Sequence, residues 1–344
     1  MRRPRYPGKN PRAFHLKYKE LQPERYVADV AKVVQAGKTP AGTHRPIMVA
    51  ELLAALAPQP GELAVDCTLG FGGHARAVLE RLQPGGRLIG LDVDPLELPR
   101  TAARLRQAGF GADVFETRRT NFAGVAQLLG EAAPAGADVI YADLGMSSMQ
   151  LDDPKRGFTF KADAPLDMRM NPQRGESASA LLARLSAGAL AEILVANADE
   201  PLADAIARRV AGQQHDTTRA LAHAVRVAVM AIRPRGGLAA AEVTVRRVFQ
   251  AIRMAVNDEL SALDALLRAL PMCLAPGGRV AILSFHSGED RRVKKAFQAA
   301  RRAGIYLAAG DEVVRASAEE VRANPRASSA KLRWAAKVPA PASL

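Results

Sequence analysis

The chain has 344 residues, with 48 Lys and Arg against 35 Asp and Glu, and its formal net charge is +13. Residues 1–45 hold 11 basic and 3 acidic side chains and residues 291–344 hold 12 and 4, which leaves 25 basic and 28 acidic side chains in between. This excludes a uniformly basic, histone-like protein, and the two basic ends favour a polyanionic partner such as nucleic acid.

The first 42 residues form a basic extension rich in Pro and Gly, with one plausible helix at Pro23–Ala36. We expect this extension to become ordered only on a partner. From Thr43 onward, short apolar strands alternate with helices, and several strands end in an acidic residue. The predicted strands are Glu62–Asp66, Arg87–Asp92, Ala112–Glu116 and Asp138–Asp143, and the predicted helices are Ile47–Ala57, His74–Leu82, Pro95–Ala108 and Phe122–Leu129. Four such repeats predict an α/β fold with a doubly wound parallel sheet.

The pattern changes after the fourth strand. A charged loop covers residues 151–175, and residues 176–256 are rich in Ala and Leu with helical spacing. The alternation then resumes, with a helix at Asn257–Leu270, a turn at Pro276-Gly277-Gly278, a strand at Arg279–Phe285, a basic helix at Arg291–Arg302 and a last strand at 331–338. We therefore predict a sheet domain made of residues 43–150 and 257–344, interrupted by an all-helical insert at residues 151–256.

The glycine turn after the first strand predicts a ligand site. Asp66 ends that strand, and Gly70 and Gly72 follow on the turn into the next helix, while Asp92 ends the second strand. Glycines there let the backbone approach a ligand, and an acid at the end of the second strand is placed to bind ribose hydroxyls. The relaxed pattern Gly70-x-Gly72-x-x-Ala75 also fits a nicotinamide enzyme, so that alternative stays open. Asp66 favours S-adenosylmethionine (SAM), because a cationic sulfonium is attracted by acids that would repel a pyrophosphate.

Two further segments follow strands and should lie at the same edge of the sheet. Asp143 to Gln150 supplies an acid, two hydroxyl groups and an amide, and His286 follows the fifth strand. Phe158 and Phe160 lie among basic residues, where they either stack on a base or pin the loop to the core. None of these segments contains a Cys/His pair or an HExxH metal motif.

The cysteine content and the apolar runs bear on the cellular compartment and on whether the chain enters a membrane. Cys67 and Cys273 lie far apart in apolar runs, which suits a reducing compartment such as the cytoplasm. No run approaches the length of a membrane helix, and the Arg-rich N-terminus lacks the apolar core of a signal peptide.

Taken together, the motifs resemble those of the bacterial 16S rRNA (cytosine-N4) methyltransferases, the MraW-like family that modifies cytosine 1402 of the decoding centre. The resemblance runs from about residue 43 to 335. It is carried by the stretches Thr43–Glu51, Asp66–His74, Leu91–Pro95, Asp143–Gln150, Arg156–Met170, Val248–Leu260, Pro276–Arg291 and Asn324–Leu332.

The resemblance implies a class I SAM-dependent methyltransferase fold, SAM as cofactor, and 16S rRNA or the small ribosomal subunit as partner, without a membrane. It also implies the following cofactor-binding residues: Gly72, Gly73, His74, Asp92, Phe122, Asp143 and Gln150. A homodimer is compatible with it.

Methylation of the exocyclic amine needs the base out of its stack and acceptors for the two N4 hydrogens. We expect Asp143, Ser147 and the backbone carbonyl of Leu144 to supply them, with Asp167 and His286 as secondary candidates for the proton acceptor.

The sequence departs from the family pattern in three places: Val93 replaces a basic residue, Met149 replaces a proline, and Glu242–Val245 replaces His-Pro-Ala-Thr. None removes an expected cofactor ligand. Besides a nicotinamide-dependent oxidoreductase, a non-catalytic RNA-binding factor with a relic cofactor site stays an alternative, although the intact acid and glycine set argues against it.

Overall fold

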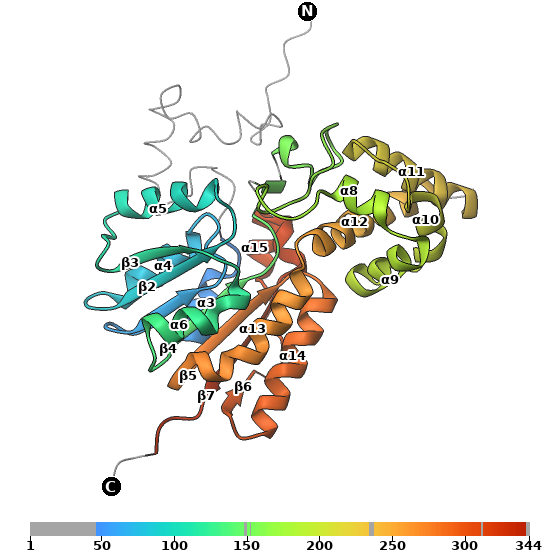
Figure 1. Cartoon of the computed structure of the whole chain (residues 1–344). Coiled ribbons are helices and arrows are strands. Elements are labelled where there is room, and N and C mark those ends of the chain that lie inside the picture. Colours follow the sequence, from blue (N-terminus) through green and yellow to red (C-terminus); the bar gives the residue numbers. More distant parts are fainter. Residues whose placement is uncertain (1–45, 148–149, 152, 234–236, 311, 342–344) are drawn as a thin grey trace, which may run out of the picture.

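The computed structural model describes residues 46–147, 150–151, 153–233, 237–310 and 312–341. In Figure 1, helices cover both faces of a central sheet, and a separate group of helices lies beside it. The basic extension, with the helix predicted at Pro23–Ala36, lies outside the described residues, so the expectations about it stay predictions.

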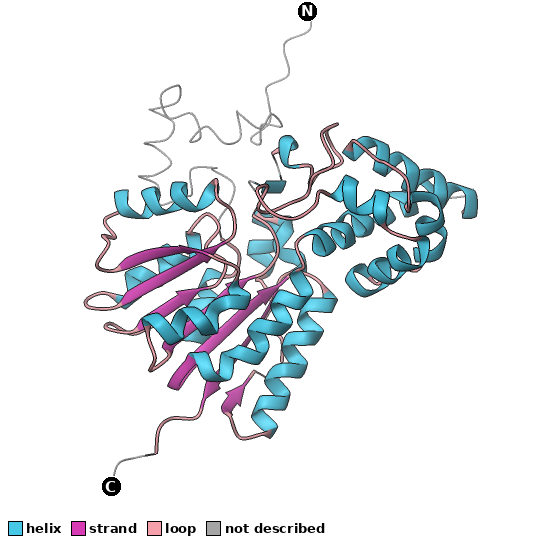
Figure 2. Ribbon diagram, in the orientation of Figure 1, coloured by secondary structure: helices cyan, strands magenta, loops and turns pink. Residues whose placement is uncertain are grey.

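Among the described residues, seven strands form one sheet in the order β3-β2-β1-β4-β5-β7-β6. Figure 2 shows this sheet in magenta with helices packed around it. Strands β1 to β5 are parallel to their neighbours, whereas β7 runs antiparallel to both β5 and β6. The bounds are β1 Leu63–Asp66, β2 Arg87–Asp92, β3 Phe115–Arg119, β4 Ala137–Asp143, β5 Leu274–Ser284, β6 Tyr306–Ala309 and β7 Lys331–Lys337. The predicted Rossmann-like, doubly wound α/β fold is confirmed.

Alternating side chains of the strands pack into two cores on opposite faces of the sheet. Ala64 and Leu88 join one core, while the adjacent Val65 and Ile89 join the other, as the period of two in a strand requires. The first core is covered by helices α3 Val49–Leu56, α4 Gly73–Leu82 and α5 Glu97–Gln107. The second core is covered by α6 Val125–Ala132, α13 Glu259–Cys273 and α14 Ser287–Arg302.

The part of the chain between β4 and α13 forms the separate helical group, whose own apolar core runs from Phe158 to Ile252. Its helices are α8 Ala178–Arg184, α9 Ala187–Ala198, α10 Ala203–Val210, α11 Thr218–Ile232 and α12 Gly237–Val256. Ser177, Ser186 and Thr217 cap the N-termini of α8, α9 and α11 by accepting a backbone N–H, which satisfies a donor that the helix itself leaves unpaired. The long helix α12 ends beside α13, with Asp258 between them in a left-handed conformation.

Several predicted bounds differ from the structure. Strand β3 lies three residues further along than predicted, and the short strand β6 was not predicted at all. The turn predicted at Pro276-Gly277-Gly278 is an irregularity inside β5, where the register with β4 shifts. The loops also contain short helical segments: η2 Phe122–Gly124, η3 Pro154–Arg156, α15 Ala318–Ala323 and η4 Pro325–Ser329.

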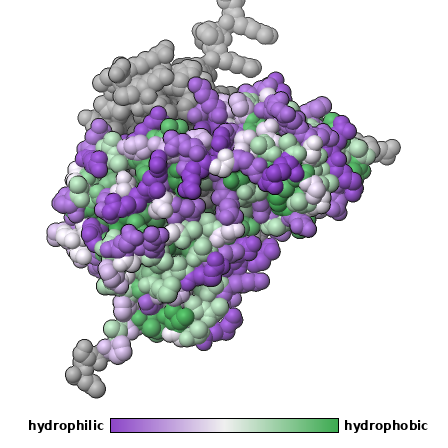
Figure 3. All heavy atoms as spheres, in the orientation of Figure 1, coloured by the Kyte–Doolittle hydropathy of each residue, from purple (hydrophilic) through white to green (hydrophobic). Residues whose placement is uncertain are grey.

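The surface in Figure 3 is polar over most of the visible face, with apolar residues gathered mainly towards its lower end. Large apolar side chains such as Met272 and Leu307 are exposed. In the described part of the chain, no helix has the length and apolar character needed to cross a membrane.

Candidate active site

The carboxyl ends of β1, β2, β4 and β5 meet at one edge of the sheet, where they border a cavity of about 1320 Å³. The strand order reverses between β1 and β4, and ligands of open α/β sheets bind at such a reversal. The cavity exceeds the usual range for one small molecule, so it offers room for two ligands. The expected site residues that line it are Gly72, Gly73, His74, Asp92, Phe122, Asp143, Ser147, Gln150 and His286. Asp66 and Asp167 do not line it.

The glycine turn after β1 brings backbone to the cavity wall. Gly72 has a φ of 81°, which a residue with a side chain rarely adopts, and a Cβ there would lie 2.8 Å from Thr101. A Cβ on Gly73 would lie 2.7 Å from Pro46. Both positions are therefore packed too closely against the protein for a side chain, and only glycine lets the backbone of the turn take this place on the cavity wall.

Asp92 lies at the end of β2 and is fixed by two backbone donors. Its carboxylate accepts the N–H of Gly70 at 2.8 Å and that of Asp94 at 2.9 Å. Desolvation raises the pKa of Asp92 to about 6, although these N–H groups act in the opposite direction. Asp66, fully buried behind the cavity wall, has its pKa raised to about 7 by the same cause, against the N–H of Thr68. A cation in the cavity would stabilise both ionised carboxylates.

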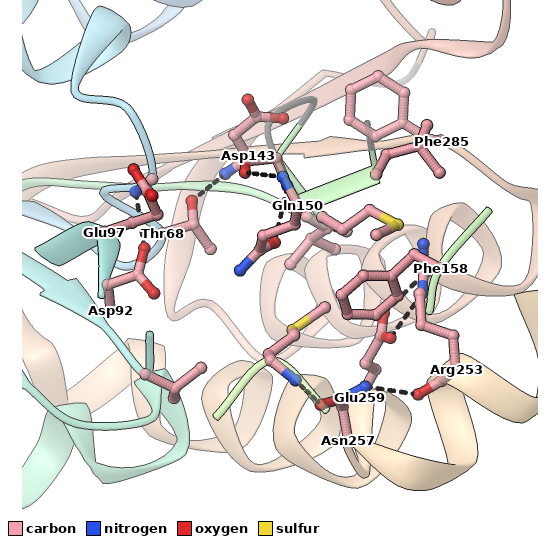
Figure 4. A pocket seen from close by; sticks show the side chains of 18 of the residues that line it. Thr68, Asp92, Glu97, Asp143, Gln150, Phe158, Arg253, Asn257, Glu259 and Phe285 are labelled. Carbon is pink, nitrogen blue, oxygen red and sulfur yellow. Dashed lines mark hydrogen bonds and ion pairs between the residues drawn. The ribbon is translucent and has the colours of Figure 1, made fainter. Parts of the chain in front are cut away.

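Glu97, which the sequence did not single out, lines the cavity close to Asp92 (Figure 4). One carboxylate oxygen accepts from Arg100 at 2.7 Å. The other, Oε2, is buried and has no hydrogen-bond partner among the described residues. Because a buried carboxylate oxygen normally accepts a hydrogen bond, this orphaned atom indicates a ligand with a donor group.

Asp143, at the end of β4, faces both the cavity and His74. Its side chain is 32% exposed, and Oδ2 lies 3.5 Å from Nδ1 of His74. His74 donates from Nε2 to the carbonyl of Ile47 at 2.9 Å, since a carbonyl can only accept. Desolvation raises the pKa of Asp143, with His74 acting against the shift and Glu289 adding to it. Asp143 is thus an acid whose proton affinity the site has increased.

Ser147 and Gln150 are joined by reciprocal bonds in the loop after β4. The N–H of Ser147 donates to Oε1 of Gln150 at 3.1 Å, and the N–H of Gln150 donates to Oγ of Ser147 at 3.2 Å. Nε2 of Gln150 donates to Asp94 at 2.8 Å. Gln150 is buried and held by protein groups, so its role as a cofactor contact stays a prediction.

His286 caps helix α14. Its Nδ1 accepts the N–H of Gly288 at 3.2 Å and that of Glu289 at 3.4 Å, and is therefore unprotonated. Nε2 lies 3.1 Å from the carboxylate of Glu289. Burial alone would raise the pKa of Glu289, but the contacts with His286 lower it. Nδ1 is thus occupied by the helix cap, whereas the buried Nε2 lies beside Glu289 without a hydrogen bond to the described residues.

Asp167 lies in a tight ion pair instead of on the cavity wall. Its Oδ2 is 2.7 Å from Nη2 of Arg169, and its Oδ1 accepts from the backbone and Nε of the same residue. Burial alone would raise the pKa of Asp167, but these hydrogen bonds lower it. The structure thus does not bring Asp167 to Asp143, and its secondary catalytic role stays a prediction without geometric support.

Another part of the cavity wall carries aromatic side chains and a charged pair, and Figure 4 labels Phe158, Arg253 and Glu259 there. Phe158 and Phe160 line it, and Phe160 packs edge to face with Phe249, with ring centroids 5.1 Å apart. Arg253 and Glu259 form a double contact, with both N–O distances 2.8 Å. No local signal in the sequence marks this pair, because its members lie on two successive helices and belong to no chemical motif of their own.

Comparisons with known proteins identify relatives over nearly the whole chain. Residues 41–338 match a family model described as the MraW methylase family. The "Ribosomal RNA small subunit methyltransferase H 1" of Lachnoclostridium phytofermentans is 46% identical over 98% of this chain and 93% of its own length. The "Ribosomal RNA small subunit methyltransferase H 2" of Alkaliphilus metalliredigens is 47% identical over 98% of this chain and 97% of its own. The "Ribosomal RNA small subunit methyltransferase H" of Halorhodospira halophila is 42% identical over 90% and 99%.

Proposed function

The chain belongs to the MraW methylase family, and on that premise we propose that it methylates N4 of cytosine 1402 in 16S rRNA of the small ribosomal subunit, with SAM as cofactor. The observation that carries the proposal is the single cavity in which the glycine turn, Asp92 and Asp143 meet. The names of the curated relatives support the ribosomal RNA substrate.

The residues around the glycine turn fit SAM. When bound, SAM supplies an electrophilic methyl group on a positively charged sulfur. Gly72 and Gly73 bring the backbone to the cavity wall, and Asp92 and the orphaned Oε2 of Glu97 are acceptors for ribose hydroxyls or an amine. Phe122 lines the same end and offers an aromatic face for the adenine.

The proposed chemistry at N4 depends on acceptors, because the amine lone pair is delocalised into the cytosine ring. Asp143 opens to the cavity with a raised pKa, which suits a group that takes a proton. Ser147 and the carbonyl of Leu144 line the same stretch and are the further acceptors. His74 lies 3.5 Å from Asp143 and acts against the rise in the pKa of that carboxyl group.

We propose the same domain division as the sequence analysis. Residues 43–150 and 257–344 would form the methyltransferase domain, and the insert at 151–256 would recognise RNA. A separate apolar core among the helices of the insert supports this division. The basic extension at residues 1–42 would bind RNA phosphates.

The proposal places the protein in the cytoplasm, where small ribosomal subunits are present, and includes a homodimer. Free, buried Cys67 and Cys273 are consistent with that compartment. Sedimentation of the purified protein tests the dimer, and a single species of monomer mass would remove it from the proposal.

The decisive experiment is incubation with labelled SAM and small ribosomal subunits, followed by mapping of the modified nucleotide. Label at N4 of the expected cytosine supports the proposal, and label on another base or ring position contradicts it. Calorimetric titration with SAM and with NAD is the companion measurement. Binding of NAD in place of SAM would favour an oxidoreductase.

A further inference from the structure

A buried carboxylate outside the expected site set joins three separate segments of the chain. Asp94, just after β2, has no exposed surface. Its Oδ1 accepts the backbone N–H groups of Leu96 at 2.9 Å and Glu97 at 3.3 Å, at the start of α5. Its Oδ2 accepts from Nε2 of Gln150 at 2.8 Å and from Nη1 of Arg156 at 2.9 Å. The two oxygens thus serve two different purposes, a helix cap and a link to distant loops.

Arg156 extends the link to the far side of its own loop. Its Nη2 donates to the carbonyls of Arg169 at 3.1 Å and Met170 at 2.8 Å, and its own carbonyl accepts the N–H of Met168 at 3.0 Å. The side chain is only 11% exposed. A planar guanidinium with donors on both arms can make these contacts together, which a lysine cannot.

The link reaches the proposed site from two directions. The N–H of Asp94 donates to Asp92, and the amide of Gln150 that Asp94 holds also accepts from Ser147. Asp92, Ser147 and Phe158, two residues after Arg156, all line the cavity. One buried ion pair therefore fixes the cofactor end and the proposed base end relative to each other.

Stability alone is a weak explanation for this arrangement. A buried ion pair gives little net stability compared with an apolar pair, because desolvation offsets the attraction, whereas it does impose one geometry. We propose that Asp94 and Arg156 are positioning residues, which hold Ser147, Gln150 and the loop at residues 156–170 in the arrangement that methyl transfer requires. This inference rests on the proposed function for its activity measurement.

The variant Asp94→Asn breaks the link selectively. Asparagine caps helices as well as aspartate does, so its oxygen keeps the start of α5, while its NH₂ group faces the donors of Gln150 and Arg156. We expect turnover on small ribosomal subunits to fall about tenfold or more, with the Kd for SAM within about threefold of the original. Amide hydrogen exchange should become faster at Met168, whose N–H is bonded inside the loop.

The double variant Asp94→Asn with Gln150→Glu exchanges the carboxylate and the amide between the two positions. It tests whether restoring the contact restores the function that Asp94→Asn loses. One oxygen of the new glutamate can accept from Ser147, and the other can accept from the new asparagine, with the negative charge kept near Arg156. We expect the double variant to recover slow exchange in residues 156–170 and most of the lost turnover. A merely structural defect at Asp94 would instead be deepened by a second change in the core.

Two further variants keep the test decisive. Arg156→Lys preserves the charge but loses the forked contacts, so it should also speed exchange and lower turnover, even if Asp94→Asn does not fold. Glu80→Gln, in an exposed pair with Arg76 outside the insert, is the matched control and should change neither quantity.

Turnover and exchange at the original level in both Asp94→Asn and Arg156→Lys would overturn the inference. If the unaltered protein makes no methylated cytosine, the proposed function fails, whereas the exchange measurements still decide whether the link orders the loop.

Discussion

Asp143 is the side chain on which the proposed chemistry depends most, because it opens to the cavity and faces His74 at 3.5 Å. Asp143→Asn keeps the shape of the side chain but removes its capacity to take a proton. We expect turnover to fall at least about 100-fold, the usual scale for a lost acid–base group. Single-turnover transfer of labelled methyl to small subunits measures it. Unchanged turnover together with unchanged SAM affinity would exclude Asp143 from the site.

Asp92 and Asp66 make the affinity for SAM depend on pH. Their pKa values are raised to about 6 and about 7, and a cationic ligand favours the ionised forms, so binding releases protons. The Kd for SAM should therefore fall as the pH rises from about 5 to about 8 and level off above, since each carboxyl group is nearly fully ionised about one unit above its pKa. Calorimetry in buffers of different ionisation enthalpy measures it. Because Asp66 does not line the cavity, the variant Asp66→Asn should still bind SAM, but its Kd should depend less on pH near pH 7. A Kd independent of pH would contradict the prediction.

The same two acids affect folding in the opposite direction. Because their pKa values in the folded protein exceed the ordinary value of 3.8, the folded state binds more protons than the unfolded state. Without ligand, their contribution to stability is therefore lost as the pH rises through the range from 4 to 7.

One substitution distinguishes a helix-capping role of His286 from a role as proton acceptor. The contacts of Nδ1 are those of a helix cap, and Nε2 is buried beside Glu289. Asparagine also caps helices well, so His286→Asn should leave turnover within about threefold of the original. A fall of about 100-fold in a variant with an unchanged melting curve would instead make His286 a catalytic base.

At the scale of elements, the entry to α4 depends on the absence of side chains. In Gly73→Ala the new Cβ would lie 2.7 Å from Pro46, so the segment before α3 must move away from the turn. We expect the Kd for SAM to rise about tenfold, since small displacements at a binding loop are costly. Gly130→Ala in α6, where a Cβ meets nothing within 4 Å, is the control and should raise stability by up to about 1 kcal/mol. Equal SAM affinity in both variants would contradict the prediction.

Elements with a strong local pattern could be predicted from the sequence. Strand β2 matches its predicted bounds, because a run of apolar residues ends at Asp92, and the helices flanking it differ by a residue or two at their ends. Strand β6 could not be predicted, since its four residues are held by pairing with β7 and not by their own composition. Strand β3 is mostly polar, so its position depends on its pairing with β2.

In the candidate site, too, local patterns could be predicted from the sequence but contacts between distant segments could not. Motif residues that follow strands, such as Asp143 and Ser147, could be assigned to one edge of the sheet, and they do line one cavity. Contacts between distant segments could not, because nothing local marks that Asp94 meets Arg156, 62 residues later. Nor did the local sequence indicate that Asp167 would be held by Arg169 away from the cavity.

For the molecule as a whole, the basic extension should govern RNA affinity and not cofactor affinity. A protein that lacks residues 1–42 should bind small subunits more weakly, with a shallower dependence on salt, because each phosphate contact adds about 0.7 to 0.9 to the slope. The Kd for SAM should stay the same. Filter binding at several salt concentrations measures the slope. Equal RNA affinity at physiological salt would show that the extension has no role in binding.

The position of β7 has a consequence for biosynthesis. It is the last strand of the described chain, yet it lies inside the sheet, between β5 and β6. The segment just before it supplies Asn324, Arg326 and Ser329 to the cavity wall. A nascent chain that has not yet released Lys337 therefore exposes an open edge of β5 and has an incomplete cavity. The protein can become active only after β7 has left the ribosome, and chains that stop before β7 should be prone to aggregate.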